Sequence, residues 1–520
     1  MVEIERPVKA TDRTEPRAEV LPNDPYDATL LANTRPADWA NPRPAPSYNL
    51  VVLGAGTAGL VTAAGAAALG AKVALVEKNL LGGDCLNFGC VPSKALLRAA
   101  RFYTDLHHAP RFTGCTPPGP SEADFAAAME RMRRLRAHLS RHDSARRFQA
   151  MGVDVFLGDA AFVDRRTVEV AGARLKFTKA VVATGTRADR PPIEGLAEAG
   201  YLTNESVFNL AERPRRLLVI GGGPLGCELA QAFARLGCEV IIANREPYFL
   251  PGEERDAAEI LADALRRDGI EVRLNTEVKR VTQRDGEKRV HLANDKEEAT
   301  VAVDQILVGT GRVPNVEGLN LEAAGVEYDH DHGVRVNDYL QTRNRRIYAA
   351  GDVALEQKYT HMADATARIV IQNALFWGRK KLSSLTIPWC TYTDPEIAHV
   401  GVYVKEAQEQ DFPIKTFTVP MSDVDRAVLD GEEEGFVKIH VHEGTDTILG
   451  ATIVARHAGE MINEISLAMV AGIGLKTVSQ VIHSYPTQAE AIRKAGDAYN
   501  RTRLSPFLKA LSSRWLAWSR

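Results

Sequence analysis

Short apolar runs alternate with amphipathic stretches along this chain of 520 residues. The run "NLVVLG" at 49–54 leads into a glycine turn, an alanine-rich stretch at 60–69 and a second run, "AKVALVE", at 71–77. Uninterrupted apolar runs of this length are typical of strands buried in a parallel sheet, and the stretch between them predicts a crossover helix. The same order recurs in "RRLLVIGGG", "PLGCELAQAFARLG" and "CEVIIANR", which together span 215–245. We therefore predict two βαβ units, and with them two nucleotide-binding domains.

The pattern changes after residue 388. Strands of alternating polarity are predicted for "GFVKIHVHE" and "ILGATIVAR", and a helix for "AGEMINEISLAMVAG". These elements predict an antiparallel sheet with helices. The predicted fold class is α/β, with two Rossmann-like nucleotide-binding domains followed by a C-terminal α+β domain. The expected boundaries are 48–190 together with 313–387 for the first domain, 191–312 for the second and 388–500 for the third.

Both ends of the chain differ from these domains. Residues 1–47 are rich in Pro, Asp, Arg and Asn without apolar periodicity, which predicts a flexible extension. Residues 501–520 predict an amphipathic basic tail, because apolar side chains recur at helical spacing between cations. The apolar positions are Leu504, Leu508, Leu511, Trp515 and Trp518, and the cations are Arg503, Lys509, Arg514 and Arg520. Two interpretations stay open for this tail, a helix packed on its own dimer or a contact with a membrane surface.

The composition and the net charge of the chain argue against several classes of protein. With 45% hydrophobic and 25% charged residues, the chain is typical of a globular protein. A formal net charge of -3 gives no electrostatic case for a nucleic-acid partner, and the basic helix predicted at 123–149 is expected to present a solvated face. The first residues lack the features of a signal peptide, and no apolar stretch of about 18 residues is present to span a bilayer. We expect a cytoplasmic protein, peripheral at a membrane if its tail binds one.

The first glycine loop has the spacing of a dinucleotide site. Gly54, Gly56 and Gly59 give GxGxxG directly between the first strand and its helix. Such a loop lets the backbone approach a pyrophosphate at the N-terminus of the helix. Glu77 ends the next strand, where a carboxylate accepts hydrogen bonds from both ribose hydroxyls.

The second loop has the same spacing and a different strand end. Gly221, Gly223 and Gly226 repeat the glycine pattern, but Asn244 stands where the first unit has its acid. Arg245 follows it. A missing carboxylate beside a guanidinium suits a 2′-phosphate, so this site is predicted to prefer NADPH to NADH.

Two further segments join a strand to a glycine turn and fit a flavin near a domain crossing. They are "VVATGT", with Thr184 and Gly185, and "ILVGTGRVPN", with Gly311. Asp352 follows the buried run "RRIYAAG", which places its carboxylate to bind a ribityl hydroxyl.

The stretch "GGDCLNFGCVPSK" holds Cys85 and Cys90, which form a structural bridge, two metal ligands or a redox pair. The residues after Cys90 predict a helix with Pro92 in its first turn. A thiol at a helix N-terminus meets positive partial charge, which lowers its pKa from about 8.5, so Cys90 is the better candidate for a thiolate. A structural zinc site needs about four ligands, and no second Cys/His pair of fitting spacing accompanies this one. A redox pair and a buried inert pair remain.

The other four cysteines are expected to be small buried hydrophobic residues. They are Cys115, Cys227, Cys238 and Cys390.

In chain order, these motifs resemble the class I pyridine nucleotide-disulfide oxidoreductase family, which includes dihydrolipoamide dehydrogenase, glutathione reductase and mercuric reductase. The resemblance covers about 48–501 and rests on "GAGTAG", "GGDCLNFGCVPSK", "ATG", "GGGPLGCE", "GTGRVPN", "YAAGD", "TDPE" and "YPTQAE". It implies FAD on the first site, NADP on the second and a homodimer formed through the last domain, which becomes a dimerisation domain.

The resemblance also implies roles for site residues. Electrons would pass from nicotinamide to flavin to a disulfide, with Cys90 facing the flavin and Cys85 exchanging with substrate. Lys94 would pair with Glu228 beside the flavin, where a buried cation stabilises the reduced ring. The carboxylate makes the buried cation tolerable.

The C-terminal motif indicates the branch of the family. Disulfide-reducing members carry H-x-H-P-T-x-x-E, whose second histidine is the acid–base group, whereas this chain has "HSYPTQAE". Tyr485 takes that histidine's place and Glu490 remains. A tyrosine with an ordinary pKa of about 10 is a poor proton shuttle at neutral pH. Mercuric reductases, which the chain resembles most, carry a tyrosine there, near the metal. His483 is expected to be structural.

The resemblance thus implies NADPH-dependent reduction of Hg(II) or a similar soft metal, held transiently as substrate by Cys85 and Cys90. The chain lacks the terminal cysteine pair and the N-terminal CxxC that mercuric reductases use to deliver the metal. Two alternatives stay open: reduction of a disulfide or quinone acceptor by the same thiols, and a membrane-apposed redox module that docks a protein partner.

Overall fold

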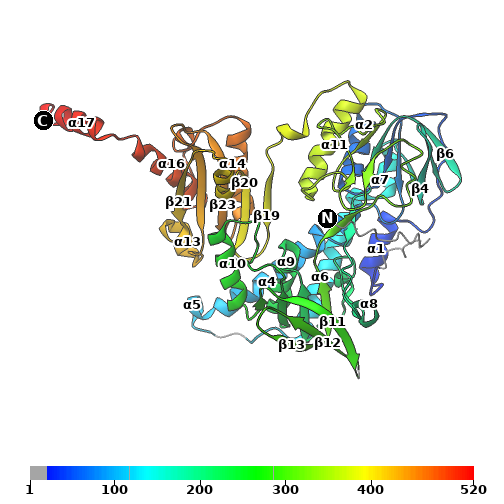
Figure 1. Cartoon of the computed structure of the whole chain (residues 1–520), viewed down its shortest axis with the longest axis horizontal. Helices are drawn as coiled ribbons and strands as arrows, with labels where there is room; N and C mark the ends of the chain where they lie inside the picture. Colours follow the sequence, from blue (N-terminus) through cyan, green and yellow to red (C-terminus); the bar gives the residue numbers. More distant parts are fainter. Residues whose placement is uncertain (1–19, 116–117, 285) are drawn as a thin grey trace, which may run out of the picture.

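The computed structural model describes residues 20–115, 118–284 and 286–520 and arranges them in three domains (Figure 1). The first domain contains a seven-stranded sheet in the order β3-β2-β1-β6-β5-β4, with β18 beside β6. Its strands are β1 (Tyr48–Leu53), β2 (Val73–Glu77), β3 (Asp154–Leu157), β4 (Ala160–Asp164), β5 (Thr167–Val170), β6 (Ala173–Val182) and β18 (Ile347–Ala349). Because β18 pairs with β6, the chain returns to this sheet after the second domain, in keeping with the predicted split.

Both faces of the first sheet are buried, which explains its unbroken apolar runs. Leu50 and Val52 of β1 pack against α2 (Thr57–Ala68) and α11 (Thr360–Leu375), which lie side by side on one face. Val51 and Leu53 point to the opposite face, since successive side chains of a strand alternate. The short pairs β7 (Thr186–Ala188) with β15 (Arg312–Pro314) and β16 (Tyr328–Asp329) with β17 (Gly333–Val334) complete this part of the chain.

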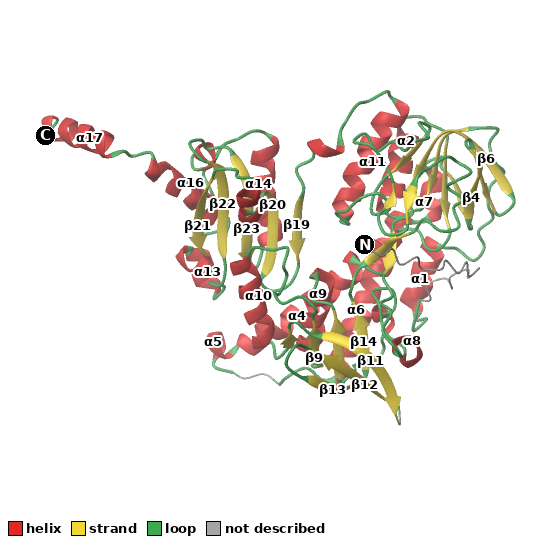
Figure 2. Ribbon diagram, viewed as in Figure 1, coloured by secondary structure: helices red, strands yellow, loops and turns green. Residues whose placement is uncertain are grey.

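The second domain has a parallel sheet in the order β10-β9-β8-β14 and an antiparallel sheet in the order β11-β12-β13. Figure 2 shows these strands together at one end of the molecule. The parallel strands are β8 (Arg216–Ile220), β9 (Glu239–Ala243), β10 (Glu271–Arg273) and β14 (Gln305–Val308). The antiparallel strands are β11 (Glu277–Arg284), β12 (Glu287–Ala293) and β13 (Glu298–Val303). The helices are α8 (Leu196–Ala199), α9 (Pro224–Arg235) and α10 (Arg255–Arg267).

The segment between β2 and β3 is helical, and two of its helices pack against α9. Its helices are α3 (Gly83–Asn87), α4 (Cys90–His108), α5 (Pro110–Thr113), α6 (Glu122–Ser140) and α7 (Ala145–Ala150). Phe125 of α6 contacts Phe233 of α9, and α4 lies along α9 in the same core. The helix that carries Cys90 is thereby fixed against the second domain.

The third domain is a five-stranded antiparallel sheet in the order β19-β20-β23-β22-β21, as its alternating pattern predicts. Its strands are β19 (Pro388–Thr391), β20 (Glu396–Gly401), β21 (Ile414–Pro420), β22 (Phe436–His442) and β23 (Ile448–Ala455). Its helices are α12 (Val404–Glu409), α13 (Asp425–Asp430), α14 (Ala458–Val470), α15 (Leu475–Val478) and α16 (Glu490–Thr502). Helix α14 packs on β20 and β23, whereas α16 packs on β21 and β22 at the other edge.

The prediction of a flexible extension over 1–47 is wrong for its described part. Residues 20–47 contain α1 (Pro25–Thr34), which is capped by Asp24 and has the buried residues Asp27 and Leu30. Apolar periodicity was too sparse to indicate a helix, because α1 is held mainly by buried ion pairs. Residues 1–19 lie outside the described part of the chain.

Helix α6 corrects a second expectation. Arg133 and Arg136 do not belong to a solvated face: Arg133 Nε donates to Asp24 Oδ2 at 2.6 Å, and Arg136 Nη2 donates to Asp27 Oδ1 at 2.9 Å. Both guanidinium groups are buried, and they join α6 to α1.

The structure also shows how far each of the other four cysteines is buried. Cys227 and Cys238 are buried as expected, but Cys115 is exposed and Cys390 is half-buried. Cys390 belongs to β19, next to the residues that contact Lys94.

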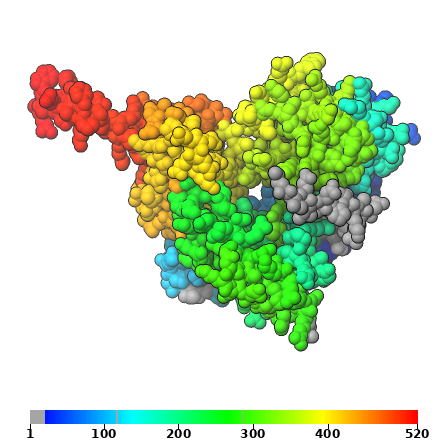
Figure 3. Space-filling model, in the orientation of Figure 1, coloured from blue at the N-terminus to red at the C-terminus, as the bar shows by residue number. Residues whose placement is uncertain are grey.

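The C-terminal tail forms α17 (Pro506–Trp518), which extends away from the third domain (Figure 3). None of its side chains is buried, and Trp515 and Trp518 are 63% and 79% exposed. Within the described residues, no helix has the length and apolar character needed to cross a membrane.

Candidate functional site

The first glycine loop is built for close packing. Gly54 directly follows β1 with φ of 99°, and a Cβ there would lie 2.3 Å from the carbonyl oxygen of Ala183. A Cβ on Gly59 would lie 1.8 Å from the carbonyl oxygen of Gly54, so only glycine lets α2 approach the strand. Gly56 caps α2, and a Cβ there would lie 3.7 Å from the Cα of Gly83, an ordinary contact. No side chain caps the N-terminus of α2, which leaves its N–H groups available to a phosphate group.

Glu77 lies at the end of β2 and closes this loop. Its carboxylate accepts from the backbone N–H of Ala55 at 2.6 Å and of Asn79 at 2.7 Å. Burial raises the pKa of Glu77, against the effect of these two hydrogen bonds. The predicted ribose acceptor thus also holds the glycine turn in place.

The second loop repeats this geometry with an amide. Asn244 Oδ1 accepts from the N–H of Gly222 at 3.3 Å, as Glu77 does from Ala55. Gly226 packs on Gly221, whereas a Cβ on Gly223 would meet open space at the N-terminus of α9. Arg245 follows Asn244 and is exposed. The strand-end positions predicted from the sequence are the positions that the structure shows.

The segments around Gly185 and Gly311, where the chain crosses between the first two domains, meet beside the loop that carries Cys85 and Cys90. Thr184 Oγ1 donates to the carbonyl of Asn315 at 2.7 Å, so the turns around Gly185 and Gly311 lie in adjoining segments. Asp352 accepts from Thr186 Oγ1 at 3.3 Å. Burial raises the pKa of Asp352, although the Arg312 guanidinium opposes this shift.

Both thiols are free and half-buried, and each perturbs the pKa of the other. Cys90 is the first residue of α4, as predicted, and Cys85 lies in α3. The hydrogen bond from Cys85 lowers the pKa of Cys90 to about 6 despite burial, with further lowering by the Thr360 hydroxyl and the Lys94 cation. The same hydrogen bond and burial raise the pKa of Cys85. These opposite shifts favour the thiolate at Cys90 and the neutral thiol at Cys85.

Lys94 and Glu228 form the predicted ion pair. Lys94 Nζ lies 2.7 Å from Glu228 Oε2, and the Glu228 side chain is 4% exposed. Burial alone would lower the pKa of Lys94, but the Glu228 carboxylate outweighs it and the pKa is raised. The backbone N–H of Tyr392 donates to Glu228 Oε1 at 3.0 Å, and Lys94 Nζ lies 4.6 Å from the Tyr392 ring centre.

Tyr485 and Glu490 lie apart from the thiols. Tyr485 is 71% exposed, and its hydroxyl donates to Asp425 of α13 at 2.8 Å, which raises its pKa. Glu490 begins α16 and pairs with Arg493 at 2.7 Å. Since α16 packs on β21 and β22, these residues occupy the edge of the third domain opposite β19. His483 contacts Glu464 at 3.0 Å.

Two residues that contact the thiol site were not identified from the sequence. Thr360 Oγ1 lies 3.2 Å from Cys90 Sγ, and Tyr392 contacts both members of the Lys94 ion pair. Both residues come from distant segments, so no local spacing could identify them. A hollow of about 400 Å³ beside Tyr392 is lined by α11, β19 and α14.

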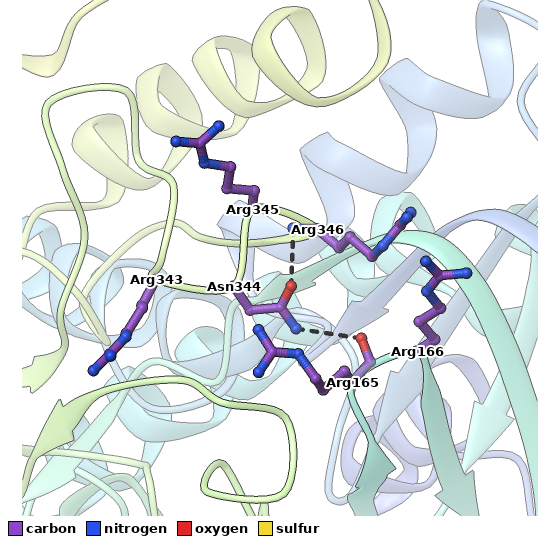
Figure 4. A pocket seen from close by; sticks show the side chains of 6 residues that line it. All are labelled: Arg165, Arg166, Arg343, Asn344, Arg345 and Arg346. Atoms are coloured by element: carbon purple, nitrogen blue, oxygen red, sulfur yellow. Dashed lines mark hydrogen bonds between the residues drawn. The ribbon is translucent and has the colours of Figure 1, made fainter.

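A second hollow, of about 440 Å³, is separate from this site and lined by arginines (Figure 4). The turns 165–166 and 343–346 carry them, and buried Asn344 joins these turns by donating to the carbonyl of Arg165 and accepting from the N–H of Arg346. The guanidinium groups point in different directions and do not converge on one ligand.

Within the described residues, no group of three or more His, Cys, Asp or Glu side chains is arranged to hold a metal ion. The two thiols would bind a substrate metal only as a two-coordinate pair, which suits a soft cation.

We predict that Thr360→Val raises the pKa of Cys90 by about half a unit to one unit, the equivalent of one lost hydrogen bond. A thiolate persists above its pKa, so reactivity of Cys90 in the native protein falls as the pH drops through about 6. In the variant this loss should begin at a higher pH. Peptide-resolved alkylation with iodoacetamide between pH 5 and 8 measures it. Thr360→Ser should restore the native profile, and an unchanged T360V profile would contradict the assigned contact.

Comparisons with known proteins agree with this geometry. Residues 48–368 match the family described as "Pyridine nucleotide-disulphide oxidoreductase", and residues 387–496 match its dimerisation domain. A mercuric reductase from Lysinibacillus sphaericus is 33% identical over 96% of this chain and 89% of that protein. A dihydrolipoyl dehydrogenase from Thermus scotoductus is also 33% identical, over 88% of this chain and 98% of that protein.

Among solved structures, the HOCl-induced flavoprotein disulfide reductase RclA from Escherichia coli, as a Cu(II) complex, superposes with a TM-score of 0.78 at 28% identity. The match covers 87% of this chain and 100% of that chain. The predicted fold class and the resemblance are both confirmed. The chain therefore belongs to the pyridine nucleotide-disulphide oxidoreductase family and is a flavin disulfide oxidoreductase.

Proposed function

We propose that this enzyme transfers two electrons from NADPH through FAD and the Cys85–Cys90 pair to Hg(II) or a similar soft metal ion. The balanced reaction converts NADPH and Hg(II) into NADP⁺, a proton and Hg(0). The observation that carries this proposal is Tyr485, which replaces the histidine of disulfide-reducing relatives. The hydrogen bond that the Tyr485 hydroxyl donates to Asp425 raises the pKa of Tyr485 above its ordinary value. Tyr485 is therefore unsuited to transfer protons near neutral pH.

The residues of the first domain fit FAD. The loop at Gly54–Gly59 leaves the N-terminus of α2 open, Glu77 carries a carboxylate at the ribose position, and Asp352 is a partly satisfied acceptor near the crossing turns. FAD, when bound, would relay the electron pair between nicotinamide and the thiols. We assign it to 48–190 with 313–387, NADP to 191–312 and dimerisation to 388–500.

The chain's own residues prepare the thiols for a soft cation. Cys90 is held as a thiolate by Cys85, Thr360 and Lys94, so one sulfur is ready to bind without losing a proton. Cys85 supplies the second sulfur after its proton leaves. Glu228 keeps Lys94 charged in its partly buried position. The Lys94 cation stabilises negative charge at Cys90 and would do the same for the ring of a bound flavin.

The test measures NADPH oxidation by the purified holoenzyme with Hg(II) and excess thiol, and separately with oxidised lipoamide. We expect sustained turnover with Hg(II), and less than about a hundredth of it with lipoamide, because loss of acid–base catalysis costs about 10²–10⁴-fold. Cys85→Ser should abolish turnover with Hg(II). Tyr485→His is the matched variant, and it should raise lipoamide turnover.

The second candidate is a reductase of a disulfide or quinone acceptor. The dihydrolipoyl dehydrogenase match, equal in identity to the mercuric reductase match, favours it. Turnover with lipoamide but not with Hg(II) would contradict our proposal and support this second candidate. Quinone reduction that survives Cys85→Ser would place the chemistry on the flavin alone.

We also propose that the second site prefers NADPH. Asn244 removes the carboxylate that would repel a 2′-phosphate, and exposed Arg245 follows it at the end of β9. Arg245→Gln should raise KM for NADPH about tenfold, or about 1.4 kcal/mol, and leave KM for NADH within about twofold. Arg215→Gln, on an exposed arginine at the start of β8, is the control. Equal effects on both nucleotides would contradict the assignment.

We propose a homodimer in which Tyr485 of one subunit faces the thiols of the other. Tyr485 lies at the edge of the third domain opposite β19, whereas β19 is the strand next to the thiols. Tyr485 therefore does not contact the thiols of its own chain. Leu467, Val470 and Ile482 of the third domain are exposed large apolar residues, as an interface requires.

For the tail, we propose contact with an anionic membrane surface. Phe507, Leu508, Leu511, Trp515 and Trp518 fall on one face of α17, all of them exposed. Residues 498–520 contain cations and no Asp or Glu. Lys509 lies opposite this face and Arg514 lies at its border. An apolar, aromatic face with Lys and Arg on the rest of the helix is typical of helices that lie in a membrane interface.

Removal of 504–520 should abolish co-sedimentation with vesicles that contain phosphatidylglycerol, and leave the melting temperature and dimer unchanged. The reason is that α17 buries no side chain on the rest of the chain. Trp515→Ala with Trp518→Ala should weaken binding, and Ser512→Ala with Ser513→Ala is the control. A dimer that dissociates on truncation would show instead that α17 packs on its own dimer.

A further inference from the structure

Residues 20–35 pack directly on the loop that carries the two thiols. An apolar cluster separate from the domain cores joins α1 to this loop, and its buried members are Val20, Leu30, Leu80, Leu86 and Phe88. Leu86 and Phe88 lie between Cys85 and Cys90 in the chain. Movement of α1 would therefore displace the segment that sets the distance between the two sulfurs.

Arg136 of α6 connects α1 to the same segment by hydrogen bonds. Its Nη2 donates to Asp27 Oδ1 at 2.9 Å, and its Nη1 donates to the carbonyl oxygen of Asn87 at 3.0 Å. The side chains of Arg136 and Asp27 are each 1% exposed. A guanidinium holds two acceptors in one rigid plane, which the single ammonium of lysine cannot do. The main chain between the thiols is thus fixed to a carboxylate of α1.

The chain after α1 is bonded to the segment that precedes the thiol loop. The N–H of Leu81 donates to the carbonyl of Thr34 at 3.2 Å, and Arg35 Nη1 donates to the carbonyls of Lys78 at 2.8 Å and Asn79 at 2.6 Å. The thiol loop is therefore held at its start and at its middle by residues 20–35.

We propose that residues 20–35 are a clamp that sets the redox properties of the Cys85–Cys90 pair, with Asp27 and Arg136 as positioning residues. The inference rests on the proposed role of these cysteines as a redox pair. Residues 20–35 and Arg136 hold the main chain between the two thiols through Leu86, Phe88 and the carbonyl of Asn87, and thereby hold the two sulfurs in place. A loosened clamp lets this segment move in the dithiol, whereas in the disulfide the covalent bond fixes the distance between the sulfurs, so the dithiol becomes less favourable relative to the disulfide.

The clamp is tested on the holoenzyme by equilibration with glutathione buffers. In this exchange the Cys85–Cys90 bond is broken and two thiols form, while two glutathione molecules are oxidised to one glutathione disulfide. Asp27→Asn removes the carboxylate charge, and Arg136→Lys keeps a cation that cannot bridge both acceptors. We expect each variant to lower the equilibrium constant for reduction about tenfold, which is about 30 mV for a two-electron couple. The pH profile of Cys90 alkylation should shift to higher pH in parallel.

Asp38→Asn is the matched control, because Asp38 lies in the same N-terminal segment and forms an exposed ion pair with Arg146 of α7 at 2.7 Å. It should leave both readouts native. If D27N does not accumulate as folded protein, R136K decides the matter alone. Folded, FAD-bound variants with the native equilibrium constant and the native pH profile would overturn the clamp and leave the proposed function standing. Native enzyme whose cysteines show no reversible exchange with glutathione would overturn both.

Discussion

The ion pair between Lys94 and Glu228 joins all three domains at the thiol site. Lys94 belongs to the helix that begins at Cys90, Glu228 belongs to α9 of the second domain, and Tyr392 of the third domain contacts both. Removal of the Lys94 charge would leave the buried Glu228 carboxylate, which is 4% exposed, without its cation, whereas Lys94 is 35% exposed and would be partly solvated if Glu228 were removed. The charge beside the thiols therefore depends on a contact in which all three domains take part.

This arrangement explains why the thiolate and its neighbours can be stable together. A thiolate, an ammonium and a carboxylate in one partly buried site carry a net charge of -1, and each has a hydrogen-bond partner that helps to stabilise it. Cys85 and the Thr360 hydroxyl, which lies at the N-terminus of α11, both lower the pKa of Cys90. The site therefore favours a thiolate in a half-buried position, which suits a pair that reacts with an electron acceptor.

Local sequence patterns were sufficient for most of the fold and much of the site. The spacing at Gly54–Gly59, the strand end at Glu77 and the helix start at Cys90 each depend on contacts within a few residues or one βαβ unit. Such contacts impose a residue type, because only glycine permits the approach of α2 to β1. The extension was mispredicted because α1 is stabilised by Asp24 and Asp27 with arginines more than a hundred residues away. Polar residues with distant partners look the same as solvated ones in a sequence.

The sequence by itself determined the two nucleotide units, the position of the thiol pair and the family, because these follow from short-range geometry that restricts residue choice. The tertiary structure decided the rest: which hydroxyl contacts Cys90, that Tyr485 is bonded to Asp425, and that the N-terminal segment packs on the thiol loop. These contacts join segments that are distant in the chain. A hydrogen bond or a buried ion pair constrains the distance between two side chains but leaves no spacing in the sequence, so only the folded chain reveals it.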